Sequence, residues 1–310
     1  MLPQGLLSFP LTPFTSDDRV DTDAFCKHLE AHLAADPAAV FVACGTGEFT
    51  ALSLEEFRTV VRTAVEAVAG RVPVYAGAGG GPAQARATAV IAEESGADGL
   101  LLMPPYLVSS TPRGLLDHIR YVVAATKLPT VVYQRANAVL SPETAVELLD
   151  EPTVVGVKDG IGDVAEMLRI VTAVRTSGHT RAKEFGFLNG LPTAELSAVA
   201  YDAIGVSNYS SATLACAPDI AARFHQAYRA GDRASMDVLL RDFYLPFAEL
   251  RDLVPGYAVA LIKAGAGLSG LAMGGVRPPL VDPQPEHVAR LEELIARGRA
   301  ALASLDTAAA

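Results

Sequence analysis

The chain has 310 residues, half of them apolar, so it can bury a large hydrophobic core. Its formal net charge of −10 at pH 7 excludes a general attraction to nucleic acid or to an anionic membrane, and we expect neither as a partner. No apolar run reaches the roughly 18 residues of a membrane span, and the N-terminus lacks the cationic start of a signal peptide. The three cysteines are odd in number and form no CxxC pair, which favours a reducing, cytoplasmic location.

Short apolar segments alternate with amphipathic segments from the N-terminus to about residue 230. Most of the short segments are rich in Val, Ile or Leu without polar alternation, which is typical of parallel strands covered on both faces. They predict strands over residues 6–11, 40–43, 72–76, 99–103, 130–133, 154–157, 185–188 and 204–207. The amphipathic segments predict helices over residues 22–34, 54–69, 82–95, 112–125, 142–149, 163–176, 193–202 and 217–230. Eight such units in tandem predict an α/β protein with a closed (β/α)8 barrel, the TIM-barrel fold.

Helix start signals support two of these boundaries. Ser53 has the position of an N-cap, with Glu56 completing a capping box, and Ser141 precedes a proline at the first helical position. The barrel is expected to occupy residues 1–231. Residues 232–304 show no strand signal and predict a C-terminal helical extension of the same domain. The alanine-rich tail, residues 305–310, is expected to be disordered.

Lysine is rare in this chain, with five lysines against twenty arginines. An amine can lose its proton and attack a carbonyl, whereas a guanidinium cannot, so a rare lysine is a candidate for chemistry. Barrel enzymes carry their active sites at the carboxyl ends of the strands, and Lys158 directly follows the apolar segment 153–157. Lys158 could instead be a surface lysine at the start of a loop. The apolar strand directly before it argues against this alternative. Of the other lysines, two are predicted on the opposite face of the barrel, Lys127 and Lys183. Lys27 is predicted in the first helix and Lys263 in the extension.

Polar residues end three further strands. Tyr133 either packs in the core or relays protons at the barrel mouth, and the sequence leaves both open. Gly45 and Thr46 follow the second strand, where they form either a carboxylate cradle or a tight turn. Ser210 and Ser211, near the end of the eighth strand, are expected to face the mouth as well.

Two patterns typical of cofactor or metal sites are incomplete. The glycine run 77–82 has Pro82 in place of the last glycine of GxGxxG, so we expect a turn at the barrel rim rather than a dinucleotide site. His28 and His32 are one helical turn apart but lack the glutamate of HExxH, so we expect them on a solvated helix face. The remaining histidines are scattered, and no metal site is predicted.

Three of these motifs, in order, resemble the dihydrodipicolinate synthase / N-acetylneuraminate lyase superfamily over nearly the whole chain. They are the Gly-Thr-Gly-Glu turn that begins at Gly45, the strand-terminal Tyr133 and the Gly-Val-Lys-Asp segment around Lys158. Members are class I aldolase-type barrels with a Schiff-base lysine on the sixth strand. Further segments, among them 5–10, 158–163, 190–195 and 256–265, resemble the superfamily's decarboxylating sugar-acid dehydratases.

The sequence departs from the synthases of this superfamily at three positions. Gly45 replaces the first of two threonines, Leu107 replaces a tyrosine shared between subunits, and Ala138 replaces an arginine. These differences argue against dihydrodipicolinate synthesis.

The dehydratase resemblance implies a six-carbon 2-oxo diacid as substrate. Lys158 would form an imine with the ketone, in its free-amine form favoured by burial, and Tyr133 would move a proton. Loss of water and then CO2 would follow, with no metal or organic cofactor. Arg135 would bind the distal carboxylate, because a fork of donors suits that group.

The same resemblance assigns the remaining polar groups. Gly45 and Thr46 would hold the carboxylate beside the ketone, and Ser210 and Ser211 would contact the middle of the substrate. A homotetramer is implied as well. Two alternatives stay open: a pyruvate-dependent aldolase of the same superfamily, and a non-catalytic 2-oxo acid sensor.

Overall fold

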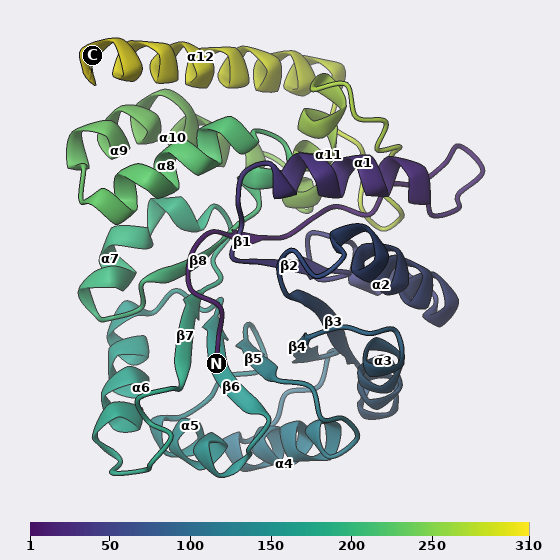
Figure 1. Cartoon of the computed structure of the whole chain (residues 1–310), viewed down its shortest axis with the longest axis vertical. Coiled ribbons are helices and arrows are strands. Elements are labelled where there is room, and N and C mark those ends of the chain that lie inside the picture. The colour runs from purple at the N-terminus through teal and green to yellow at the C-terminus, as the bar shows by residue number, and fades with distance from the viewer. Residues whose placement is uncertain (310) are drawn as a thin grey trace.

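A computed structural model describes residues 1–309, and in this part of the chain eight parallel strands close into a barrel in sequence order (Figure 1). The barrel closes because β8 pairs with β1, with Leu7 opposite Ser210. The predicted (β/α)8 fold is therefore confirmed. The strands are β1 (Leu7–Ser8), β2 (Ala39–Val42), β3 (Val74–Gly80), β4 (Gly99–Pro105), β5 (Thr130–Gln134), β6 (Val154–Asp159), β7 (Gly186–Asn189) and β8 (Asn208–Ser211).

The barrel helices begin close to their predicted positions. Ser53 accepts a hydrogen bond from the Glu56 amide at 3.2 Å, and the Glu56 carboxylate accepts one from the Ser53 amide at 2.9 Å, which confirms the capping box. Ser141 caps its helix in the predicted way. The helices are α1 (Thr22–Leu33), α2 (Leu54–Val68), α3 (Pro82–Glu94), α4 (Pro112–Val123), α5 (Pro142–Glu147), α6 (Val164–Thr176), α7 (Ala198–Ala203) and α8 (Pro218–Ala230).

The strands lack polar alternation because both of their faces are buried. In β2, Val40 and Val42 pack outward against the helices, while Phe41 packs inward in the barrel. There its ring stacks on Phe9 and on Tyr75, with centroids 4.7 Å apart in each pair. These stacked rings belong to the core inside the barrel, and barrel enzymes bind their ligands at the carboxyl ends of the strands.

The eighth strand differs from its prediction, because it spans Asn208–Ser211 rather than residues 204–207. Gly205 has φ +83°, so the predicted segment forms a turn after α7. The true strand is polar, and the side chains of Asn208, Ser210 and Ser211 form hydrogen bonds with partners distant in the sequence. For example, the side-chain amide of Asn208 donates a hydrogen bond to the Pro3 carbonyl at 3.0 Å.

The glycine run at 77–82 was expected to be a turn, but Gly77–Gly80 belongs to β3. A β-carbon on Gly77 would lie 2.2 Å from the Ala43 carbonyl oxygen. Glycine is needed here so that the chain just beyond β2 can approach β3 closely.

His28 and His32 were expected on a solvated face of α1, and both are buried. The Leu11 amide donates to His28 Nε2 at 3.1 Å, and Ser8 Oγ lies 2.6 Å from His32 Nδ1. The two rings therefore join α1 to the segment that contains β1. No group of three or more His, Cys, Asp or Glu residues suited to a metal occurs among the described residues.

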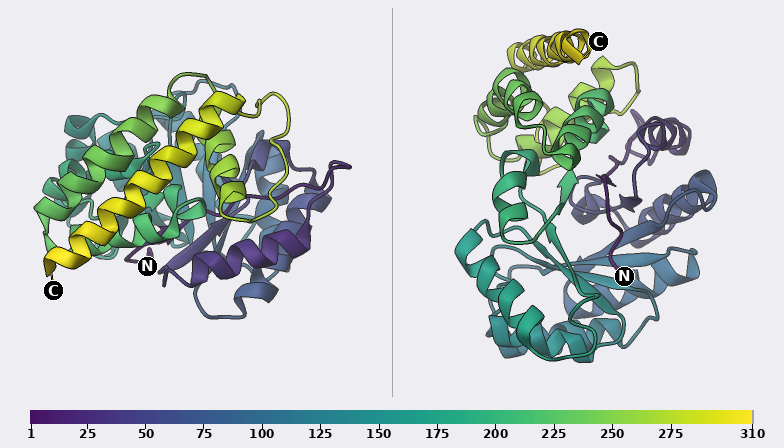
Figure 2. Two further views of the ribbon diagram at one scale, coloured as in Figure 1. Left: turned by 90° about the horizontal axis from the view of Figure 1, so that it is seen from above. Right: turned by 60° about the vertical axis from the view of Figure 1, so that its left-hand side comes forward.

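The helices that follow α8 pack together beside α8 and α1, at the top of Figure 1, and α12 crosses their outer side (Figure 2). Their core includes Phe224, Phe243, Tyr257 and Leu291. None of the helices in the described chain is long and apolar enough to cross a membrane. The elements are α9 (Arg233–Leu239), the π-helical turn η5 (Leu240–Tyr244), α10 (Leu245–Arg251), α11 (Tyr257–Leu268) and α12 (Pro285–Ala309).

The end of α12 departs from the disordered tail expected over residues 305–310. The helix continues to Ala309, and Ala310 lies outside the described residues. Alanine has the highest helix propensity of all residues, so an alanine-rich end prolongs a helix that is already packed on its neighbours.

Candidate active site

Lys158 is a buried amine without a charge partner. It lies near the carboxyl end of β6 and is 6% exposed. Its Nζ lies 4.0 Å from the Phe9 ring centroid and 4.7 Å from that of Tyr133, and no described residue forms a hydrogen bond or ion pair with it. Burial lowers the pKa of the amine from 10.5 to about 8, and the nearby Arg135 guanidinium contributes in the same direction. An appreciable fraction of Lys158 is therefore a free nucleophile near neutral pH.

Tyr133 stands beside Lys158 on the neighbouring strand β5, in direct register with it. Its hydroxyl donates to the Gly190 carbonyl at 3.2 Å and lies 3.4 Å from Arg135 Nη1. Burial raises the pKa of the phenol, so Tyr133 is protonated at neutral pH. A protonated phenol beside an amine can pass a proton to and from a molecule bound between them.

Two glycines make room for this pair. A β-carbon on Gly160 would lie 2.8 Å from the Tyr133 ring, and one on Gly190 would lie 2.4 Å from Lys158 Cε. The loop after β6 therefore packs closely against Tyr133, and the loop after β7 packs closely against Lys158. Each position requires glycine because any side chain would displace a reactive group.

Asp159 fixes the loop after β6, a role that was not predicted from the sequence. Its buried carboxylate accepts hydrogen bonds from the Tyr201 hydroxyl, from Gln134 Nε2 at 2.7 Å and from the amides of Ile161 and Gly162 at 3.1 and 3.3 Å. The signal available in the sequence was an acidic residue directly after the buried lysine. These bonds hold β5, β6 and the following loop in one arrangement around Lys158.

Lys158 and Tyr133 line a cavity of about 240 Å³ at the barrel mouth. Gly45, Thr46, Arg135 and Ser210 line the same cavity, so these predicted site residues do come together. The lining includes two cations and no carboxylate among the described residues. This charge balance suits an anionic ligand.

Ser211 lies elsewhere. Successive residues of a strand point to opposite faces, and the Ser211 hydroxyl donates to the buried Glu195 carboxylate at 2.6 Å on the outer side of β8. The structure thus places Ser210 at the cavity and Ser211 away from it, contrary to the expectation that both would contact a ligand.

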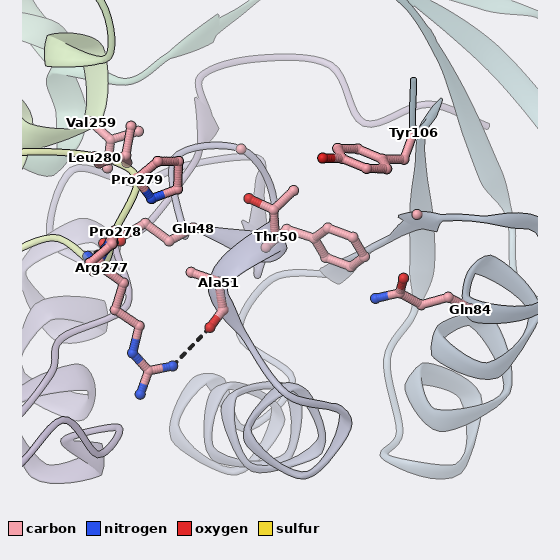
Figure 3. Close-up of a pocket in the computed structure, with 13 residues that line it drawn as sticks. Glu48, Thr50, Ala51, Gln84, Tyr106, Val259, Arg277, Pro278, Pro279 and Leu280 are labelled. Atoms are coloured by element: carbon pink, nitrogen blue, oxygen red, sulfur yellow. Dashed lines mark hydrogen bonds between the residues drawn. The ribbon is translucent and has the colours of Figure 1, made fainter. Parts of the chain in front are cut away.

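A larger cavity of about 510 Å³ adjoins the first, sharing Gly45, Val259 and Leu280 with it (Figure 3). Its charged groups are all paired. Arg277 points to the Ala51 carbonyl, as Figure 3 shows, and also binds Glu56, with its Nη2 2.6 Å from the carboxylate.

Glu48, also at this larger cavity, is paired with the buried amine of Lys263 at 2.7 Å. Lys263 was predicted in the extension, and its contact with the barrel was not predicted. Because these charges are neutralised, reactive groups are concentrated in the smaller cavity.

The model of the dihydrodipicolinate synthetase family matches residues 2–297. The chain belongs to this family. The predicted resemblance is therefore confirmed, and it extends through the barrel and most of the extension. Among solved structures, dihydrodipicolinate synthase from Oceanobacillus iheyensis superposes with a TM-score of 0.85 at 26% identity, covering 94% of this chain and 95% of that one.

Two relatives within the family are much more similar in sequence. A Streptomyces griseus protein named Probable 5-dehydro-4-deoxyglucarate dehydratase is 55% identical over 299 residues, which is 96% of this chain and 93% of the relative. A Streptomyces coelicolor protein named Probable 5-dehydro-4-deoxyglucarate dehydratase 1 is 53% identical over 298 residues, covering 96% of this chain and 94% of the relative.

Proposed function

We propose that this chain is a hydro-lyase that converts 5-dehydro-4-deoxyglucarate to 2,5-dioxopentanoate, water and CO2 through a Schiff base on Lys158. The observation that carries the proposal is the buried, unpaired amine of Lys158 in a cavity lined by cations and no carboxylate. The names of the two relatives supply the substrate. The dianionic substrate takes up one proton overall, so the atoms and charges of the products balance.

The amine of Lys158 attacks the C5 ketone and expels water, which gives a protonated imine. The imine withdraws electrons and acidifies the adjacent C4 methylene, and Tyr133 relays the proton that leaves it. The resulting enamine expels the C3 hydroxyl as water. A conjugated imine remains, extending from the nitrogen to C3.

This conjugated imine accepts the electron pair of the C1–C2 bond, and C1 departs as CO2. The C2 enol that forms becomes the aldehyde, and hydrolysis of the imine returns the free Lys158. One electron sink thus serves both eliminations, and Lys158 carries it from the first step to the last.

The other lining residues have binding roles in this proposal. Gly45 and Thr46 hold the carboxylate next to the ketone, and Ser210 contacts the middle of the substrate. Arg135 attracts the distal carboxylate, the group that is lost. Ser211 is left out, because its hydroxyl is bound to Glu195.

The test is to incubate the protein with 5-dehydro-4-deoxyglucarate, reduce with borohydride and determine the mass of the Lys158 peptide. We expect an adduct lighter than the full substrate imine by water and CO2, and no adduct in Lys158→Ala. An adduct that keeps the whole substrate, or forms only with pyruvate, would move the assignment to an aldolase. No adduct with either compound would contradict the Schiff base and favour a 2-oxo acid sensor.

A further inference from the structure

Helix α11 begins at the wall of the cavity that contains Lys158. The helix has 12 residues, and Gly256, Ala258 and Val259, from its cap and first turn, line the cavity. Gly256 is the N-cap, with φ +91°, and supplies no side-chain cap. Gly256 has no side chain, so backbone atoms at the start of α11 line the same space as the reactive amine.

Two amide groups in this first turn have no acceptor among the described residues. The Tyr257 amide donates to the Val254 carbonyl at 3.2 Å, but no hydrogen bond is formed by the amides of Ala258 and Val259. The first amides of a helix carry partial positive charge, and together they attract an anion. They are thus available to a ligand in the cavity.

Lys158 provides an independent sign that an anionic ligand binds in this cavity. It is 6% exposed, has no hydrogen-bonding partner in the described chain and lines the cavity together with Ala258. Arg135 adds a second cation, and none of the lining side chains is acidic. A buried amine, a guanidinium and a free helix N-terminus around one cavity suit a ligand with more than one negative charge.

We infer that the N-terminus of α11 binds the distal carboxylate of a six-carbon 2-oxo diacid and shares it with Arg135. This inference rests on the proposed function. The ketone must reach Lys158, and Gly45 and Thr46 take the nearer carboxylate, so the far end of the chain needs donors on another wall. Arg135 is exposed and its Nη1 lies 3.4 Å from the Tyr133 hydroxyl. A carboxylate has about four acceptor sites, more than one guanidinium fork fills, so it can accept from the amides of α11 as well.

The position of the distal carboxylate also bears on the reaction itself. The C1–C2 bond can release its electrons only when it overlaps the conjugated imine. Amides on α11 that hold the C1 carboxylate fix the direction of this bond relative to the imine on Lys158. The first turn of α11, which belongs to the extension, thereby helps to determine which substrates the barrel accepts.

The test uses two ligands of equal length that differ only at the far end. 2-Oxoadipate has a distal carboxylate and 2-oxohexanoate has a methyl group, and neither has a hydroxyl to eliminate. Both are trapped on Lys158 with borohydride, and the concentration for half-maximal labelling is measured for each. For the unaltered protein we expect 2-oxoadipate to label at a concentration about tenfold lower, the ratio for one charge-assisted interaction.

Ala258→Asp introduces a repelling charge at the second position of α11. A carboxylate in the first turn stabilises a helix, so folding is preserved, and labelling by 2-oxohexanoate reports that the site is intact. We expect the preference for 2-oxoadipate to fall at least fivefold, on the order of one lost charge-assisted bond. Ala258→Pro, which removes one amide at a position that tolerates proline, should lower it about threefold without a change in net charge.

Ala83→Asp is the matched control. Ala83 is exposed, is likewise the second residue of its helix after a glycine N-cap, and lines neither cavity. This control should keep the preference within about twofold of the unaltered protein.

A preference that Ala258→Asp and Ala258→Pro leave unchanged, and that Arg135→Leu alone abolishes, would overturn the inference while the Schiff base stands. Absence of any adduct on Lys158 would overturn the proposed function, and the inference with it.

Discussion

Lys158 shows how the surroundings of one residue decide its chemistry. Its pKa is lowered mainly by burial, and no carboxylate of the described residues forms an ion pair that would raise it again. The folded protein therefore buries the Lys158 amine, which would have a lower free energy if it were protonated and in water. This cost is typical of a reactive residue, because the same burial that weakens the fold produces a free amine.

Lys158→Met should consequently stabilise the protein at pH 7, by about 1–3 kcal/mol. The folded state binds the lysine proton less tightly than the unfolded state does, so stability rises as the pH rises from about 8 to 10.5. The advantage of Lys158→Met should shrink over this range. Urea unfolding at pH 7 and at pH 10 measures it, and a variant no more stable than the parent at pH 7 would contradict the expectation.

Gly190 tests how closely the lysine is confined. In Gly190→Ala the new β-carbon would lie 2.4 Å from Lys158 Cε, so the amine must move. A displacement of about 1 Å can cost about a hundredfold in rate, and we expect imine formation to slow by that order. The rate of borohydride-trapped labelling by a 2-oxo acid measures it. Gly267→Ala is the control, because a β-carbon there meets nothing within 4 Å, and an equal loss in both variants would refute steric confinement.

At the scale of elements, boundaries set by local signals were predictable and those set by distant partners were not. The caps at Ser53 and Ser141 depend on residues three positions away, and both were predicted. Strand β8 was misplaced because it is polar and its partners lie on β1, β7 and the N-terminal segment. The burial of His28 and His32 was missed for the same reason, since their neighbours on the β1 segment are about twenty residues away.

The histidine pair that joins α1 to the β1 segment should make the fold sensitive to acid. Burial lowers the pKa of His28 to about 3 and that of His32 well below its ordinary value. Both must be neutral in the folded protein, so their contribution is complete above pH 6.5 and is lost as the pH falls toward 3.

We expect these two histidines to account for about 2–4 kcal/mol of stability lost between pH 7 and pH 5. Urea unfolding of the parent and of His28→Gln/His32→Gln at both pH values measures this. The variant should lose less stability on acidification, although it starts from a lower value. Equal losses in the two proteins would show that carboxylates alone cause the acid sensitivity.

At the scale of the whole molecule, a buried ion pair joins the extension to the barrel. Lys263 on α11 pairs with Glu48 in the loop after β2, and both side chains are almost fully buried. Glu48 also accepts from the Arg277 amide at 3.0 Å. These bonds fix α11 against the barrel, and the start of the same helix lines the cavity of Lys158.

Removal of one partner of this ion pair should be more harmful than removal of both. Glu48→Gln or Lys263→Met alone leaves an unpaired charge or polar group buried, and we expect each to cost about 3–5 kcal/mol. The double variant should be markedly more stable than the sum of the two losses predicts. A double-mutant cycle by urea unfolding measures the coupling, and strictly additive losses would refute a direct pair.

The sequence by itself determined the order of strands and helices, the barrel, and the positions of Lys158, Tyr133, Gly45, Thr46 and Ser210 at the strand ends. These features follow from hydrophobic periodicity and from the rule that barrel ligands bind at carboxyl ends, and both are local. Only the tertiary structure decided the orientation of Ser211, the network of Asp159, the burial of Lys263 and the place of α11 at the cavity. Each of these depends on which distant groups meet after folding, and no spacing along the chain encodes that.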